Sequence, residues 1–154
     1  MFYDAEEQFI KTGLQLPPAP APKGVYKPCL ISGNYLYLSG HLPVLADGST
    51  IKGRVGSELN EDEGKQAAQQ AALTMLASIK GALGSLNKVK RVVKVFGMVN
   101  GTPDFVRQPY VINGCSELFA AVWGEDAGVG TRSATGVASL PDNVPVEIEG
   151  IFEI

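Results

Sequence analysis

Apolar residues recur every three or four positions between Asn60 and Gly84, the most regular stretch of the 154-residue chain. This period predicts one long helix with an alanine-rich buried face that can pack closely on a sheet. Asn60 is a suitable N-cap, and the acidic residues 61–63 that follow it favour the positive end of the helix dipole. Gly84 predicts the end of this helix.

A second helix is predicted from near Pro109 to just before Gly124. Proline lacks a backbone N–H and is not tolerated inside a helix, so Pro109 belongs to the first turn. The apolar residues between Ile112 and Val122 then fall on one helical face. Residues 51–59, by contrast, are polar and poorly patterned, which predicts a loop.

Short apolar runs separated by turn residues predict five strands. Two of them, within residues 26–39, flank Ser32-Gly33-Asn34 and predict a β-hairpin. Three later stretches also have strand-like composition: residues 88–99, 133–140 and 144–154. The order strand-strand-helix-strand-helix-strand-strand predicts an α+β domain whose mixed or antiparallel sheet is flanked by helices.

The first 22 residues are predicted to form a separate arm, and residues 23–154 the domain. Residues 4–14 have the pattern of a short amphipathic helix. Four prolines between positions 17 and 22 then favour an extended polyproline path. A proline tract can instead be a ligand for an SH3-type domain, but no flanking arginine pattern accompanies this one.

Composition excludes several classes of function. Thirteen basic residues against 16 acidic ones give a net charge of −3, which argues against a nucleic-acid partner. One histidine, His41, and two distant cysteines, Cys29 and Cys115, cannot form a His/Cys metal site within one chain, although this count leaves an oxygen-only metal site open. No run approaches the roughly 18 apolar residues of a membrane span, and the N-terminus is acidic where a signal peptide is basic. We therefore expect a cytoplasmic protein with reduced cysteines, no metal and no membrane partner.

Two charged residues are candidates for chemistry. Arg132 follows a glycine-rich stretch, and its guanidinium can hold a carboxylate with two parallel hydrogen bonds. The alternative is a surface arginine at the start of a strand. Glu147 shares a strand face with Glu149 and Glu153, which suits either a solvated sheet face or a carboxylate that activates water. His41, beside a glycine and near a proline, is interpreted as positional rather than as the base.

The sequence also resembles the Rid/YjgF family of reactive-intermediate deaminases, formerly labelled endoribonuclease L-PSP. The resemblance rests on the run RSATGVASLP at residues 132–141, followed by the alternating acidic strand 146–149. Gly33-Asn34 followed by residues 38–43 (LSGHLP) is similar to the N-terminal region of the family. The resemblance covers residues 24–154.

This resemblance implies a chorismate-mutase-like α+β subunit, with a mixed sheet and two main helices packed on one face. It implies a homotrimer whose sheets surround a central barrel, with ligand sites in the clefts between subunits. Deaminating members hydrolyse enamine and imine intermediates such as 2-aminoacrylate to 2-oxo acids and ammonia, without a cofactor. The expected partner is thus a small carboxylate substrate.

The resemblance also implies roles for five residues. Arg132 matches the arginine that binds the substrate carboxylate, and Glu147 matches the glutamate that positions water. Tyr26 matches a tyrosine that lines the cleft, Gly40 a glycine that offers backbone contacts, and Asn113 an asparagine on the second helix.

The chain departs from the family pattern at several places. Ala134 and Gly136 replace a cysteine and a glutamate of many deaminating members, the N-terminal arm is longer, and extra residues lie around positions 105–110. These departures leave three alternatives open: a small-molecule binding protein without turnover, a hydrolase of larger enamines, and, against the acidic charge, an endoribonuclease.

Overall fold

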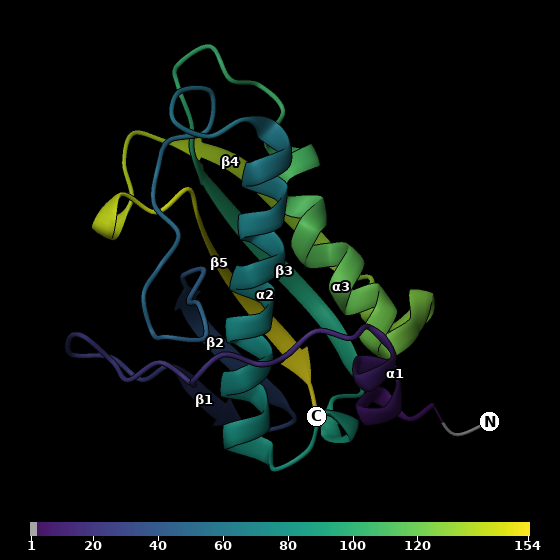
Figure 1. Ribbon diagram of the computed structural model, residues 1–154. Coiled ribbons are helices and arrows are strands. Elements are labelled where there is room, and N and C mark those ends of the chain that lie inside the picture. The colour runs from purple at the N-terminus through teal and green to yellow at the C-terminus, as the bar shows by residue number, and fades with distance from the viewer. Residues whose placement is uncertain (1–2) are drawn as a thin grey trace.

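Helices cover a single face of a five-stranded sheet in the computed structural model, which describes residues 3–154 (Figure 1). The elements are, in chain order, α1 (Ala5–Lys11), β1 (Cys29–Ser32), β2 (Tyr35–His41), α2 (Glu61–Leu83), β3 (Arg91–Asn100), α3 (Gln108–Gly128), β4 (Thr131–Val137) and β5 (Val146–Glu153). Short 3-10 turns span Leu86–Lys88 and Pro141–Asn143. The predicted order of strands and helices is confirmed.

The strand order is β1-β2-β5-β3-β4, so the sheet is mixed as predicted. Only β3 and β4 run parallel to each other, while the remaining neighbours are antiparallel. A parallel pair requires a crossover connection, which α3 supplies. The β1–β2 hairpin turns at Gly33, whose φ of 59° lies in the left-handed region that glycine adopts without strain.

The helix α2 follows its sequence signals closely. Asn60 and Glu63 form a reciprocal capping box, and Gly84 ends the helix with a φ of 82°. The helix α3 packs closely on α2 at Gly114, because a Cβ on this residue of α3 would clash with the carbonyl oxygen of Lys65 in α2.

Two predicted boundaries after residue 100 are wrong. The helix α3 was expected to end before Gly124, but a helical turn resumes after that residue and continues to Gly128. Gly124 has φ 84° and ψ 166°, so the glycine kinks the helix instead of ending it. The strand β4 occupies residues 131–137 and not 133–140, since the chain leaves the sheet before the turn at Pro141–Asn143.

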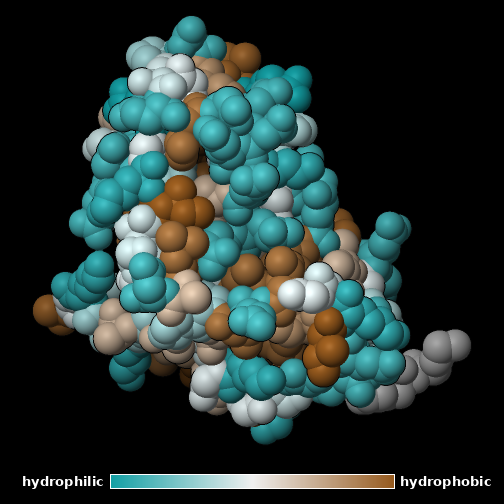
Figure 2. Space-filling view, in the orientation of Figure 1, coloured by the Kyte–Doolittle hydropathy of each residue, from teal (hydrophilic) through white to brown (hydrophobic). Residues whose placement is uncertain are grey.

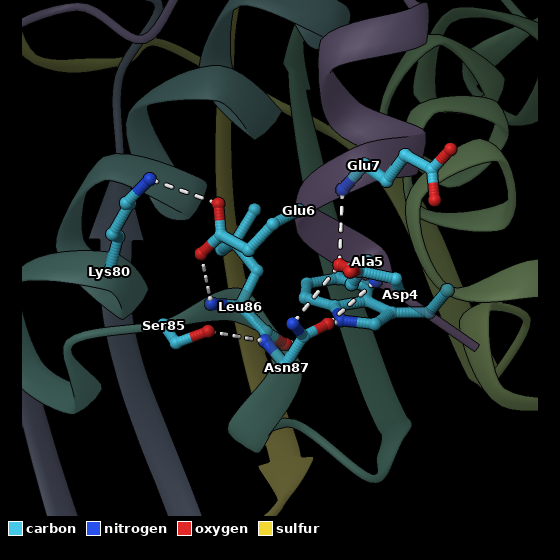
Figure 3. A network of polar contacts seen from close by, with 9 residues as sticks. Asp4, Ala5, Glu6, Glu7, Lys80, Ser85, Leu86 and Asn87 are labelled. Atoms are coloured by element: carbon cyan, nitrogen blue, oxygen red, sulfur yellow. Dashed lines mark hydrogen bonds and ion pairs between the residues drawn. The ribbon is translucent and has the colours of Figure 1, made fainter. Parts of the chain in front are cut away.

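A network of polar contacts docks α1 against the connection between α2 and β3 (Figure 3). The Asn87 side chain accepts a hydrogen bond from the Ala5 backbone N–H at 2.6 Å. The Glu6 carboxylate accepts from the Leu86 backbone N–H at 2.8 Å and pairs with the Lys80 ammonium at 2.9 Å. The start of the arm is therefore attached to the body of the protein.

Apolar contacts complete this attachment. Ala5 and Phe9 of α1 are buried and belong to the hydrophobic core. The helix is shorter than the predicted stretch 4–14, because only residues 5–11 are helical. The predicted division of the chain after Pro22 stays a prediction, and residues 1 and 2 lie outside the described part.

The two faces of the sheet differ in what covers them. On the helix side, hydrophilic side chains cover most of the surface and apolar ones show in patches between them (Figure 2). On the other face, Leu30, Tyr35 and Tyr37 are 50%, 41% and 42% exposed. Residues on this open face line a hollow of about 740 Å³, among them Leu30, Tyr37, Phe96 and Ile151.

Candidate functional site

The predicted site residues form two separate groups in the structure. Arg132 on β4 and Asn113 on α3 make up the first, which we call the arginine group. The second, the glutamate group, is centred on Glu147 of β5 and Gly40 of β2, which lie in contact. Tyr26 belongs to it because Tyr26 and Gly40 line the same cavity. Each group is preorganised by different elements of the fold.

In the arginine group, the guanidinium of Arg132 lies against the first turns of α3. Its Nη1 donates to Asn113 Oδ1 at 2.8 Å and to Ser116 Oγ at 3.2 Å, and its Nη2 donates to the Pro109 carbonyl at 3.4 Å. These contacts use three of the five N–H donors, so donors remain for a ligand carboxylate. Ser116 was not among the predicted residues, although its position one helical turn after Asn113 places both on one side of α3.

In the glutamate group, the carboxylate of Glu147 lies directly against Gly40. A Cβ on residue 40 would be 2.8 Å from Glu147 Cδ, so only glycine leaves this space for the carboxylate. Pairing of β2 with β5 is irregular between Leu38 and His41, and Gly40 lies within that irregularity. The Glu147 carboxylate has no hydrogen-bond or ion-pair partner among residues 3–154.

The electrostatic surroundings of Glu147 favour its neutral form. Partial burial raises the pKa of this carboxyl group, and the nearby charge of Glu149 raises it further. A carboxylate with a raised pKa and no internal partner is more typical of a reactive group than of a structural one.

The strand register separates the two groups within one chain. Glu147 pairs with Met98 on β3, and Met98 pairs with Thr135 on β4, so these three residues share one sheet face. Arg132 precedes Thr135 by three residues, and an odd separation turns its side chain to the other face. One copy of the chain therefore does not bring Arg132 and Glu147 together.

His41 is held as a structural residue. It is buried, its Nδ1 lies 2.6 Å from the Ser39 carbonyl oxygen, and its Nε2 lies 2.7 Å from Ser78 Oγ. A carbonyl can only accept, so Nδ1 carries the proton and Nε2 accepts from the Ser78 hydroxyl. Burial lowers the pKa of His41, which keeps the ring neutral. Both ring nitrogens are occupied, which agrees with the interpretation of this histidine as positional.

A cavity of about 340 Å³ adjoins the glutamate group. Residues 18–23 of the N-terminal arm form part of its lining, to which Leu42 and Val44 also contribute. Tyr26 and Gly40 also line this space. The contribution of the arm was not predicted, because nothing local in a proline tract indicates which surface it will cover.

The described residues were also compared with the requirements of a metal site and of a reactive thiol. Across residues 3–154, no three His, Cys, Asp or Glu side chains gather closely enough to hold a metal ion. Burial raises the pKa of the Cys29 thiol and, more strongly, that of Cys115, so neither forms a thiolate readily. Within the same residues, no helix is both long and apolar enough to cross a bilayer.

Comparison with known proteins identifies the family. The family model described as "YjgF/chorismate mutase-like, putative endoribonuclease" matches residues 6–146. The chain belongs to the YjgF family. A Trypanosoma cruzi relative, protein TCP17, is 41% identical over 94% of this chain and 90% of its own length.

Two further YjgF-family similarities bear on fold and chemistry. A protein from Dermatophagoides farinae named 2-iminobutanoate/2-iminopropanoate deaminase is 32% identical, over 92% of this chain and 94% of its own. The crystal structure of an Agrobacterium tumefaciens protein of unknown function superposes with a TM-score of 0.88 at 43% identity, covering 97% of this chain and 93% of that one. The resemblance to the Rid/YjgF family and the expected α+β fold are thereby confirmed.

Proposed function

We propose that this YjgF-family protein hydrolyses reactive 2-imino acids, and the enamines in equilibrium with them, to 2-oxo acids and ammonia. The observation that carries the proposal is the contrast between its two groups. Arg132 is held in place with spare donors, whereas Glu147 is a half-buried carboxylate without an internal partner. A substrate with a carboxylate at one end and an electrophilic carbon at the other would use both.

The reacting groups would come from two copies of the chain in a homotrimer. Arg132 and Glu147 face opposite sides of one sheet, so a small substrate can contact both only if a second copy supplies one of them. The exposed apolar side chains of the open sheet face support such an assembly, because their burial between subunits is favourable. The site then lies in a cleft between subunits.

In this cleft, Arg132 binds the substrate carboxylate and orients the imine. Asn113 and Ser116 act as positioning residues, because they fix the guanidinium without needing to touch the substrate. Tyr26 and Gly40 line the space next to the reacting carbon.

Glu147 supplies the base. It accepts a proton from water as the water oxygen attacks the imine carbon, which is already electrophilic and needs little further activation. The substrate nitrogen takes up that proton, which gives the carbinolamine. Glu147 then removes the proton of the carbinolamine hydroxyl as the carbon–oxygen double bond forms. The carbon–nitrogen bond breaks, the nitrogen receives this second proton, and ammonia and a 2-oxo acid are released. No cofactor is required for this sequence.

The test is ammonia release from 2-iminopropanoate generated in the assay, measured on co-expressed variants. Arg132→Ala and Glu147→Gln subunits are each expected to be inactive alone. If subunits assemble at random, about a quarter of the clefts combine intact Arg132 with intact Glu147, and activity returns to that extent. Activity no higher than the sum of the parents would contradict a site shared between copies.

One observation favours a second candidate function, which is ligand binding without turnover. Ala134 and Gly136 lie on the same face of β4 as Arg132, where many deaminating members carry a cysteine and a glutamate. This candidate predicts saturable binding of a 2-oxo acid to wild-type protein without ammonia release from any imine.

A further inference from the structure

The cavity beside the glutamate group is larger and more apolar than the smallest 2-imino acids require. Its volume of about 340 Å³ is within the range of small-molecule sites. The arm contributes prolines and alanines to the lining, and Leu42 and Val44 add aliphatic side chains. A substrate with a single methyl group would leave most of this space unfilled, whereas a branched or aromatic side chain would bury its apolar surface there.

The arm that forms the wall is fixed at both ends. At its start, α1 is attached through buried Phe9 and through the hydrogen bond from the Leu86 N–H to Glu6. At its end, Lys23 pairs with Asp142 at 3.4 Å, and its backbone N–H donates to the Tyr26 hydroxyl at 3.3 Å. The arm also crosses α2 on its way to β1 in Figure 1.

The proline content stiffens the path between these two attachments. Each proline restricts φ to about −65°, so the wall has little conformational freedom to lose when a ligand binds. A preformed apolar wall can therefore discriminate between side chains of different size.

The cavity and the glutamate group share Gly40. Gly40 lines the cavity and also lies against the Glu147 carboxylate, and Tyr26 lines the cavity while its hydroxyl is held by the arm. In the proposed site, a substrate side chain would lie in the cavity on one side of Gly40, and the imine carbon would lie at the Glu147 carboxylate on the other.

We propose that residues 18–23 of the arm are the specificity-determining wall of the site, and that they select 2-imino acids with a branched aliphatic or aromatic side chain. This inference rests on the proposed function. Each additional buried CH₂ contributes about a fourfold gain in binding. The preference for the leucine-derived imine over 2-iminopropanoate is therefore expected to be about tenfold or more in kcat/KM.

The experiment compares these two imines on wild-type protein and on two wall variants. Pro20→Asp places a charge in the apolar lining, and Ala21→Trp fills part of it. Both are expected to lower kcat/KM for the leucine-derived imine about tenfold more than for 2-iminopropanoate. Gln15→Asp adds the same charge to the arm outside the cavity and is expected to keep the wild-type preference. Equal losses for both imines in the wall variants, or a wild-type preference for 2-iminopropanoate, would overturn the proposal.

Binding of the corresponding 2-oxo acids separates this proposal from the proposed function. Calorimetry would compare pyruvate with 4-methyl-2-oxopentanoate on the same four proteins, with thermal melts to establish that each is folded. Tighter binding of the larger acid that is lost in Pro20→Asp supports the wall even if no imine is hydrolysed. Equal affinity for both acids, or no binding of either, overturns it whether or not ammonia is released.

Discussion

The arginine group and the glutamate group differ in how well the surrounding protein stabilises the charged side chain. Three acceptors from α3 surround the Arg132 guanidinium, and two of them are side chains. The Glu147 carboxylate instead lies against a bare glycine and beside a second negative charge, and its pKa is raised. The fold thus fixes the direction of one charge and leaves the other poorly satisfied.

This difference indicates separate roles for Arg132 and Glu147 in the proposed reaction. A cation that several hydrogen bonds already orient loses little conformational freedom when it binds an anion, which suits binding of a substrate carboxylate. A carboxylate with a raised pKa is a stronger base than an ordinary glutamate, which suits proton transfer.

Glu147→Gln is expected to have the largest effect. It keeps the size of the side chain but removes the base, so turnover should fall about 10²- to 10⁴-fold with little change in KM. Steady-state ammonia release is the measurement. The matched control is Glu149→Gln, two residues along the same sheet face and exposed. It removes only the neighbouring charge that raises the pKa of Glu147, so turnover should fall far less than in Glu147→Gln. If Glu149→Gln alone is harmful, the two glutamates have exchanged roles in our assignment.

Arg132→Lys comes next. An ammonium cannot reproduce the planar fork of a guanidinium, so kcat/KM should fall about 10- to 100-fold, mainly through KM. Arg91→Lys is the control, because Arg91 forms an ion pair with Asp126 on the surface. Equal kinetics for the two lysine variants would mean that Arg132 is a surface arginine and not a ligand for carboxylate.

Gly40→Ala tests whether the position of the carboxylate matters. Its new Cβ would come within 2.8 Å of Glu147 Cδ and displace the carboxylate, which should lower turnover about tenfold. Gly81→Ala is a suitable control, since nothing lies within 4 Å of a Cβ there. Normal turnover in a folded Gly40→Ala protein would remove the geometric argument for Glu147.

Protonation of His41 should affect the free energy of unfolding and not the pH profile of turnover. Its pKa is lowered in the folded protein, so the unfolded chain binds a proton first as pH falls below about 6.5. The free energy of unfolding should then decrease by up to about 1.4 kcal/mol per pH unit until the folded pKa is reached. Chemical denaturation between pH 7.5 and 5 measures this slope. It should flatten in His41→Asn, since the sequence has a single histidine.

The smallest effect concerns the stability of Glu147→Gln. Because the folded pKa of Glu147 is raised, its ionisation destabilises the fold above that pKa, and acidification removes the penalty. The variant should therefore melt slightly higher than wild type at neutral pH, and the difference should vanish in acid. A lower melting temperature at neutral pH would indicate that the carboxylate stabilises the fold.

Local signals in the sequence were sufficient for much of the fold. The capping residue Asn60 and the terminal Gly84 act within one helical turn, so the bounds of α2 could be predicted closely. The turn at Gly33 depends on one residue that adopts positive φ, and it defined the hairpin. Residue types and neighbours made Arg132 and Glu147 candidates, and the family resemblance gave them their predicted roles.

The neighbours of each candidate residue and the position of the arm were decided by the tertiary structure, because they depend on contacts between distant parts of the chain. Insertion of β5 between β2 and β3 determines which elements flank Glu147, and pairing through Met98 places Arg132 on the other sheet face. No periodicity within one strand contains that information. Burial of Phe9 against residues far along the chain likewise holds the arm in place and turns a proline tract into the wall of a cavity. The sequence alone therefore determined the elements and the candidate charges, whereas long-range packing decided which of them lie together.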